Sequence, residues 1–397
     1  MSLESFDVVV VGGGPAGSTA AWDLARLGHR VLLLDRAGRV KPCGGAVPPQ
    51  LLEEFDVPES LLVNRVDTAR MISPRGRAVD IPIERGFVGM VDREVYDEWL
   101  RVRAAEAGAE RRTGTFTRLG RDRDGTALVH YTVGSSRSGE PATVRARMVV
   151  GADGALSAVA RQAIPGADQA RYVFAYHEII RSPAATQQYF APARCDVFYD
   201  GRYSPDFYSW IFPHGDTTSI GTGSMQKGFD LRGSVAELRA HAGLDSCATI
   251  RREGAPIPLA PLPRWDNGRD VILAGDASGV VAPASGEGIY YAMTGGRLAA
   301  DAVDLALTRG DGRALATARR RFHRSHGSVF FVLNMMQRFW YRTDGRRERF
   351  VAICRDRDVQ RLTFEGYMYK KLVRQDPVAH ARIFFKNIGH LSGLVPV

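Results

Sequence analysis

The chain has 397 residues, of which 45% are hydrophobic and 24% are charged. A chain of this length can bury more than one layer of core, so we expect two or three subdomains. Its four cysteines, Cys43, Cys195, Cys247 and Cys354, are far apart and show no C-x-x-C spacing, which argues against a metal site and against a disulfide framework. No apolar run reaches the ~18 residues of a membrane span, and a first strand near Phe6 leaves no room for a signal peptide. We therefore expect a reduced cytoplasmic protein.

The charge is concentrated at one end of the chain. The formal net charge is +9, and residues 311–397 contain 18 Lys and Arg against 7 Asp and Glu. This basic C-terminal region suggests an anionic partner, such as a membrane surface or a diphosphate. Nearly all of the basic residues are arginines, so genome composition explains the charge equally well. Because no nucleic-acid-binding motif accompanies it, we expect no nucleic-acid partner.

The first predicted unit is a strand, a glycine-rich turn and a helix. The apolar run at residues 8–11 predicts a buried parallel strand, and the sequence GGGPAG follows it directly. In such a turn Gly12 permits the bend, Gly14 lets a phosphate approach the backbone, and Gly17 lets the helix pack on the strand. Asp35 ends the next apolar strand, where a carboxylate can accept the ribose hydroxyls of a dinucleotide. This unit therefore predicts a dinucleotide site.

Two later signatures make the cofactor more specific. They are GADG at residues 151–154, and Gly275-Asp276 followed by Pro283, Gly286 and Gly288. Both resemble the FAD-binding motifs of flavoproteins with the para-hydroxybenzoate hydroxylase fold. That resemblance implies that Asp153 lies on the pyrophosphate side, that Asp276 contacts the ribityl phosphate region, and that the turn up to Gly288 lies against the flavin. No second glycine-rich fingerprint follows a strand, so a reductant such as NADPH is expected only as a visitor.

The remaining elements predict an α/β fold with an insertion. A helix is expected at residues 93–107, capped by Asp92, and strands at 113–119, 126–133 and 142–150. Short alternating strands at 162–264 indicate an antiparallel or mixed β-sheet, and the chain then returns with a strand at 271–274 and a helix at 288–307. The expected domains are a discontinuous Rossmann-like FAD-binding domain, an inserted substrate-binding sheet and a helical C-terminal region, at residues 1–161 with 265–310, 162–264 and 311–397.

Alternating aromatic residues in the insertion are candidates for a substrate wall. Tyr208, Trp210 and Phe212 alternate at strand spacing and are expected to face one side, and Phe198 and Tyr176 are candidates to join them. Such a pattern suits an ordinary sheet core. It also suits the wall of an apolar tunnel, in which each buried CH₂ group of a ligand contributes about 0.8 kcal/mol.

Four longer motifs resemble one family. The loop PCGGA at residues 42–46, PDFYSWIFP at 205–213 and SGEGIYYA at 285–292 resemble the geranylgeranyl reductase family, and NMMQRFWY at 334–341 resembles its bacteriochlorophyll branch. The resemblance implies stepwise reduction of three isolated C=C bonds of a geranylgeranyl chain to give phytyl. It also implies that the substrate is geranylgeranyl-bacteriochlorophyllide or geranylgeranyl diphosphate, that FAD is the cofactor, and that NADPH is the transient reductant.

The family motifs assign roles to individual residues. The residues expected to bind FAD are Gly12, Gly14, Pro15, Ala16, Gly17, Asp35, Arg36, Cys43, Gly44, Gly45, Arg93, Asp153, Gly154, Gly275, Asp276, Pro283, Gly286, Gly288 and Ile289. Tyr208, Trp210 and Phe212 are expected to contact the substrate. Cys43 either donates a proton to the substrate or is a small buried hydrophobe.

Two acid–base residues near these motifs have simpler expected roles. His214 stands where the wider family often has Lys, and we expect a histidine in a surface turn. Glu287 either relays protons or caps the following helix, and we expect the cap.

Three readings stay open from the sequence. The shared fold also accommodates an FAD-dependent aromatic hydroxylase, whereas the absence of a Trp-x-Trp-x-Ile-Pro motif disfavours a halogenase. A pigment carrier with a structural FAD is the third interpretation.

The apolar and aromatic residues 329–341 suit either a buried helix, which we expect, or a helix in a bilayer interface, with the protein peripheral on the photosynthetic (intracytoplasmic) membrane.

Overall fold

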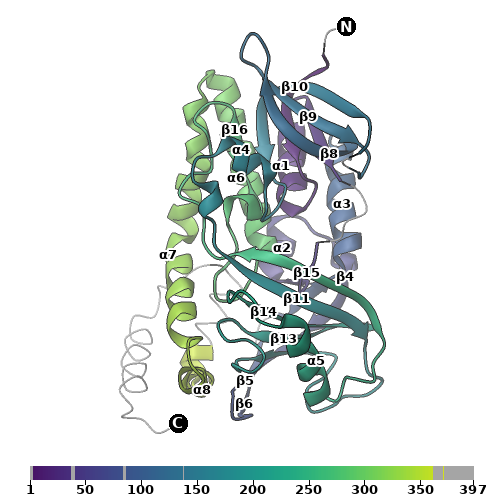
Figure 1. Ribbon diagram of the computed structural model, residues 1–397, viewed down its shortest axis with the longest axis vertical. Coiled ribbons are helices and arrows are strands. Elements are labelled where there is room, and N and C mark those ends of the chain that lie inside the picture. The colour runs from purple at the N-terminus through teal and green to yellow at the C-terminus, as the bar shows by residue number, and fades with distance from the viewer. Residues whose placement is uncertain (1–2, 37–40, 84–85, 137, 361–369, 371–397) are drawn as a thin grey trace. The chain divides into compact units, whose positions relative to one another are not determined.

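The computed structural model describes residues 3–36, 41–83, 86–136, 138–360 and 370 (Figure 1). The chain divides into two compact units. Unit 1 comprises residues 1–41, 93–172 and 256–327, and unit 2 comprises residues 42–92, 173–255 and 328–397. This division differs from the expected domains, because residues 42–92 belong to unit 2. The reason is strand pairing: β5 (Thr68–Ile72) lies beside β12 (Arg194–Phe198), and β6 (Ala78–Pro82) lies beside β5.

Unit 1 is built on a six-stranded sheet. Its strands are β1 (Ser5–Val11), β2 (Val31–Asp35), β8 (Glu110–Arg121), β9 (Ala127–Val133), β10 (Pro141–Gly151) and β16 (Val271–Leu273). Strand β1 lies between β2 and β10, and all three are parallel, as are β8 next to β2 and β16 next to β10. Strand β9 pairs antiparallel with both β8 and β10. The parallel core with its buried valines and leucines confirms the predicted Rossmann-like fold.

Two helices of unit 1 cross at small residues. The helices of this unit are α1 (Pro15–Arg26), α3 (Arg93–Glu106), α4 (Ala158–Ala163), α6 (Ile289–Arg309) and the first part of α7 (Thr317–Trp340), with short 3₁₀ turns at Ala167–Gln169, Gly275–Ser278 and Gly312–Ala316. Helix α1 packs on α6, and a Cβ atom at Gly296 would overlap the backbone of Ala16. Only glycine therefore fits at this crossing, which holds the start of α1 against α6.

Unit 2 contains a seven-stranded sheet in the order β15-β11-β14-β13-β12-β5-β6. The strands not yet given are β11 (Tyr172–Arg181), β13 (Ser209–His214), β14 (Thr217–Ser224) and β15 (Thr249–Pro258). A three-stranded sheet is formed by β3 (Ala46–Val47), β7 (Val88–Val91) and β4 (Leu62–Val66). The helices are α2 (Pro49–Glu54), α5 (Leu231–His241), the end of α7 and α8 (Asp344–Ile353), and a 3₁₀ turn spans Glu59–Leu61.

The end of α7 is buried on one side only. Val329, Phe330 and Trp340 are buried as expected, whereas Phe331 is 68% exposed and Met335 is 54% exposed. The prediction of a buried helix is therefore right for one face and wrong for the other. Within the described ranges, no helix is both long and apolar enough to cross a membrane. In the basic C-terminal region, residues 361–369 and 371–397 lie outside the described residues.

Candidate cofactor and substrate sites

The three glycine and aspartate motifs meet at one edge of the unit 1 sheet. Strands β1, β10 and β16 are adjacent and parallel, and Val11, Gly151 and Leu273 lie side by side at their carboxyl ends. Each motif begins at one of these three residues or within two residues after it. The carboxyl edge of a parallel sheet is where α/β folds bind nucleotides.

The first motif has the shape that a dinucleotide phosphate needs. A Cβ atom at Gly12 or Gly17 would overlap neighbouring backbone atoms, so both positions require glycine for the fold itself. At Gly14 a Cβ atom would meet nothing within 4 Å. Gly14 is the N-cap of α1, and no side chain caps that end of the helix, where Pro15 begins the first turn. Open space beside uncapped N–H groups fits a phosphate.

Asp35 lies beside this turn and has a partner that the sequence analysis missed. The Gly13 N–H donates to Asp35 Oδ1 at 3.0 Å. The Arg101 guanidinium on α3 lies 3.4 Å from Asp35 Oδ2 and 3.2 Å from the Gly13 carbonyl oxygen. Arg101 therefore belongs to the dinucleotide end of the site. It was missed because an arginine on a charged helix gives no sequence signal. Arg36, the next predicted residue, is half-buried.

Two predicted cofactor residues have structural partners of their own. Arg93 is buried and makes a two-pronged ion pair with Asp97, at 2.8 and 2.7 Å. Asp153 accepts hydrogen bonds from Ser157 Oγ at 2.5 Å and from the Ala158 N–H at 2.6 Å, which caps the start of α4. Burial raises the pKa of Asp153. Their roles toward FAD, and that of Gly154 in the adjacent turn, stay predictions.

The third motif forms a turn against α1 and α6. Gly275 has a φ of +64°, and its Cβ would lie 2.6 Å from that of Ala16. Asp276 is buried and paired with Lys41, a second residue that sequence reasoning missed. The turn that contains Pro283 and Gly286 closes through a hydrogen bond from the Ala282 N–H to the Glu287 carbonyl at 2.9 Å and leads through Gly288 into α6 at Ile289.

The expected role of Glu287 is confirmed. Its Oε1 accepts the Tyr290 N–H at 3.2 Å, in the first turn of α6. Glu287 therefore caps that helix.

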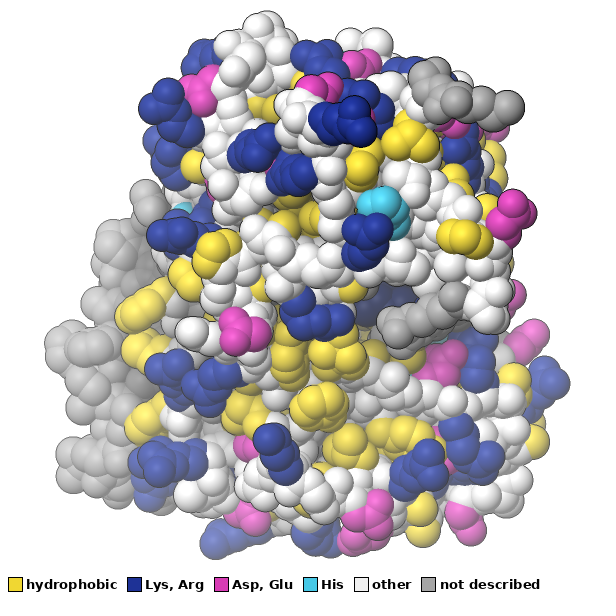
Figure 2. Space-filling view, turned by 45° about the horizontal axis from the view of Figure 1, so that its top comes forward, with side chains coloured by type: hydrophobic (Ala, Val, Ile, Leu, Met, Phe, Trp, Pro, Cys, Tyr) yellow, Lys and Arg dark blue, Asp and Glu magenta, His cyan; other side chains and the backbone are white. Residues whose placement is uncertain are grey.

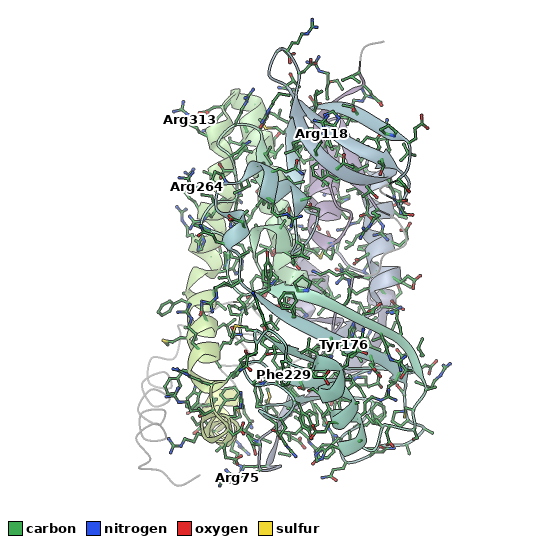
Figure 3. The ribbon with its side chains drawn as sticks, in the orientation of Figure 1. Arg75, Arg118, Tyr176, Phe229, Arg264 and Arg313 are labelled. Carbon is green, nitrogen blue, oxygen red and sulfur yellow. The ribbon has the colours of Figure 1, made fainter. Side chains whose placement is uncertain are left out.

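In unit 2 the three predicted wall residues lie together. The ring centroids of Tyr208 and Trp210 are 6.0 Å apart, and those of Trp210 and Phe212 are 6.2 Å apart. The expectation that Phe198 and Tyr176 join them is wrong. In the strand register Phe198 pairs with Ser209 and Tyr176 pairs with Thr222, so both side chains lie on the opposite face. There they pack with Ile211 and with Val235 and Leu238 of α5; Figure 3 labels Tyr176.

The loop that carries Cys43 lies against this wall. A Cβ at Gly44 would be 3.2 Å from the Phe212 ring, and one at Gly45 would be 2.5 Å from His214 Nε2. Gly45 also has a φ of +70°, which favours glycine. The Cys43 thiol is half-buried and accepts the Gly45 N–H at 3.4 Å. The contacts bring Cys43, Phe212 and His214 into one neighbourhood of unit 2.

His214 is not the surface residue that we expected. It ends β13 and is half-buried, because its ring packs on Gly45, and its Nδ1 lies 3.0 Å from the Phe212 carbonyl oxygen. Burial lowers the pKa of His214 below its ordinary value of 6.5.

This shift predicts a pH effect on stability. The folded state disfavours the protonated His214 ring. The stability that the neutral ring contributes is therefore complete above pH 6.5 and is lost as the pH falls through the lowered folded-state pKa. We expect acidification below pH 6.5 to destabilise the wild type relative to His214→Gln, by at most about 1.4 kcal/mol per pH unit. Urea unfolding of both proteins at neutral and mildly acidic pH measures this difference. Parallel pH profiles would contradict it.

The comparisons with known proteins agree with this geometry. Residues 6–195 match the family described as pyridine nucleotide-disulphide oxidoreductase. The chain is 58% identical to geranylgeranyl diphosphate reductase of Rhodobacter capsulatus, which covers 98% of both chains, and 38% identical to that of Synechocystis, which covers 97% of both.

Solved structures share the fold. A geranylgeranyl bacteriochlorophyll reductase-like protein of Thermoplasma acidophilum is 22% identical with a TM-score of 0.81, covering 95% of this chain and all of that chain. A myxobacterial FAD-dependent halogenase is 20% identical with a TM-score of 0.66, covering 83% of this chain and 82% of its own.

Proposed function

Because the chain belongs to the geranylgeranyl diphosphate reductase family, we propose that it reduces isolated C=C bonds of a geranylgeranyl chain, with FAD as the resident cofactor. The observation that carries the proposal is the convergence of three nucleotide motifs on one sheet edge of unit 1; unit 2 contains, within itself, an aromatic wall. The relatives named as reductases match the whole chain, which favours this function over a hydroxylase or a pigment carrier.

The cofactor site fits a dinucleotide at its phosphate and ribose groups. When bound, FAD supplies the electron pair and hydrogen for C=C reduction. The N–H groups at the start of α1 would hold the pyrophosphate, and Asp35, which is paired with Arg101, would accept ribose hydroxyls. The buried Asp276 pairs with the partly exposed Lys41 at the third motif, and this pair can orient a polar part of the cofactor. NADPH fits as the transient reductant because the sequence has a single glycine-rich fingerprint.

The substrate wall suits a long apolar chain. Tyr208, Trp210 and Phe212 offer aromatic surface without a charged group, so successive isoprene units can be bound by similar contacts. An isolated alkene needs a proton at one carbon as hydride reaches the other, and excluding water protects that step. Cys43 stands beside the wall and is the candidate proton donor.

The decisive test is an anaerobic reaction. Purified protein with FAD and a chemical reductant is incubated with geranylgeranyl diphosphate, and the product is analysed by mass spectrometry. We expect gains of two, four and six hydrogens in succession. A protein that binds and reduces FAD but gives no mass gain would refute the proposed function.

The role of Cys43 has a matched control in Cys247. Both thiols are free and half-buried, but Cys247 packs against the core on the α5 face of the sheet. We expect Cys43→Ala to lower kcat at least about a hundredfold, in the range of general acid catalysis, with FAD content unchanged. Cys247→Ala should retain wild-type turnover. Near-normal turnover by Cys43→Ala would remove it from the proton transfer.

Beyond the geranylgeranyl chain itself, we propose that the substrate is the pigment ester, and hence that the protein acts in bacteriochlorophyll synthesis. The motif at residues 334–341 supports this assignment, and part of it is the one-sided end of α7. Geranylgeranyl-bacteriochlorophyllide and geranylgeranyl diphosphate, offered together at equal concentration, should give mainly reduced pigment. Preferential reduction of the free diphosphate would overturn the assignment.

An exposed stripe on α7 supports peripheral attachment to an anionic membrane, on its cytoplasmic side. Phe331 and Met335 are one turn apart and exposed, and the exposed Arg338 follows on the same side of the helix; the exposed Arg342 lies in the turn after α7. Figure 2 shows Lys and Arg side chains spread over the visible face, with Asp, Glu and hydrophobic side chains among them.

The stripe predicts salt-sensitive membrane binding. We expect the double variant Phe331→Ser with Met335→Ser to co-sediment less with anionic vesicles than the wild type, and binding by the wild type to fall as salt rises. Leu156→Ser, which removes an exposed apolar side chain elsewhere, is the control. Equal co-sedimentation of all three proteins would exclude this stripe as the attachment surface.

A further inference from the structure

A chain of polar side chains runs beneath Trp210, across four adjacent strands of unit 2. The Trp210 Nε1–H on β13 donates to Ser219 Oγ on β14 at 3.0 Å. Ser219 Oγ lies 2.9 Å from His177 Nδ1 on β11, and His177 Nε2 lies 3.1 Å from Glu253 on β15. Trp210, Ser219 and His177 are buried, and the chain ends at the pairing of Glu253 with Arg251, 2.6 Å away.

The available donors and acceptors determine the direction of each hydrogen bond in this series of side chains. An indole has only a donor, so Ser219 Oγ must accept from Trp210. A carboxylate has only acceptors, so His177 must donate from Nε2 to Glu253. In the neutral ring Nδ1 is then an acceptor, and Ser219 donates its hydroxyl hydrogen to it. Every group is satisfied in this one arrangement, which fixes the tautomer of His177 and the rotation of the Ser219 hydroxyl.

The arrangement resembles a hydrolase triad in composition but not in access. The Ser219 hydroxyl is fully buried, and its bonds to Trp210 and His177 occupy it. It therefore has no exposed oxygen with which to attack a substrate. Toward the substrate wall, it accepts the Trp210 indole N–H and lies opposite Phe212 in the strand register.

The polar chain is costly for a sheet core. The opposite face of the same strands carries an apolar cluster that includes Tyr176, Ile211 and Ile220. A buried polar network is tolerated only when every member is paired, and it then fixes one geometry where apolar packing permits several. Beneath Trp210, a Cβ at Gly221 would overlap the indole, so this glycine leaves the ring its place and Ser219 sets its rotation.

Resting on the proposed function, we propose that His177 and Ser219 are positioning residues that hold the Trp210 indole in one orientation and so determine how deeply the isoprenoid chain is bound for each reduction. Glu253 holds the His177 tautomer. Without the hydrogen bond from Trp210 to Ser219, the indole rotates. The isoprenoid chain is then held less well in the positions that the later reductions need. The expected consequence is early release of partly reduced product.

The experiment compares two serines that are equally buried on opposite faces of one sheet. Ser219→Ala removes the anchor, and Ser209→Ala removes a hydroxyl that bonds Thr222 at 2.8 Å on the other face. Both proteins are prepared with FAD and assayed anaerobically with geranylgeranyl diphosphate. For Ser219→Ala we expect KM to rise about fivefold to tenfold, the effect of one hydrogen bond, with partly reduced chains accumulating. Ser209→Ala should give the wild-type product pattern.

A second measurement does not depend on turnover. In protein labelled with ¹⁵N-tryptophan, the Trp210 indole signal is the one lost in Trp210→Phe. We expect Ser219→Ala to shift this signal and to speed its hydrogen exchange, while Ser209→Ala leaves it unchanged. An unchanged signal, or a product pattern shared by both serine variants, would overturn the proposal. If the wild type reduces no geranylgeranyl chain, the proposed function fails, whereas the indole signal still tests the anchor.

Discussion

Replacing Gly14 with alanine should lower the affinity for FAD by about a hundredfold while leaving the fold intact. An added methyl group would occupy the open space at the start of α1 and push the phosphate away from the N–H groups. Losing one or two hydrogen bonds to a charged group costs about 1.5–3 kcal/mol each. The backbone at Gly14, with φ of −77°, suits alanine, so urea unfolding of the apoprotein should be unchanged or slightly stabilised. Fluorescence titration of the apoprotein with FAD measures the affinity.

Alanine substitutions at two other glycines serve as comparisons for Gly14→Ala. Gly345 is exposed on α8 and also has open space around its Cβ position, so Gly345→Ala should leave FAD affinity unchanged. At Gly17 the same substitution meets the backbone of Gly12, so Gly17→Ala should destabilise the fold as well as the cofactor site. Wild-type FAD affinity in Gly14→Ala would show that the phosphate binds elsewhere.

The second large effect is expected at Arg347, whose substitution with methionine should destabilise the protein by about 3 kcal/mol. This buried guanidinium donates to the carbonyl oxygens of Pro205 and Tyr341, the latter at 2.5 Å, and pairs with Asp344. Methionine fills similar volume but leaves two carbonyls without their donor. Urea unfolding measures the loss.

The exposed Arg342 is the matched control, since Arg342→Met removes the same charge from the neighbouring surface. It should change stability by less than about 0.5 kcal/mol. Pro205 lies three residues before Tyr208, so Arg347→Met should also weaken substrate binding at the wall. Equal stabilities of Arg347→Met and Arg342→Met would mean that the buried hydrogen bonds of Arg347 make no net contribution to the free energy of unfolding.

Much of unit 1 could be predicted because its signals are local. A run of apolar residues followed by glycines predicts a strand and a turn, and Asp35 at the end of the next strand predicts the ribose site. Helix α5 also carried a local signal, since Asp230 caps it by accepting the Gly233 N–H at 2.9 Å, but the alternating strands around it obscured the helical spacing.

The rest of the site depends on pairings between distant residues. Arg101 reaches Asp35 only because α3 lies beside the first turn, and Lys41 reaches Asp276 across more than two hundred residues. The chain from Trp210 to Glu253 depends on the order and register of four strands. The same register places Phe198 on the wrong face for the wall. A shift of one residue would reverse that, and sequence alternation alone does not fix the pairing partner.

The division of the chain into interleaved stretches has a consequence for how the protein is made. Each unit is assembled from three separate stretches, so β1 is synthesised long before β16 and Asp276, which complete its sheet and its site. At ribosomal rates of about 5–20 residues per second, that interval is on the order of tens of seconds. During this interval, the early apolar strands have an unpaired sheet edge and must be protected from aggregation. For the same reason, no single cut in the chain releases a complete nucleotide-binding domain.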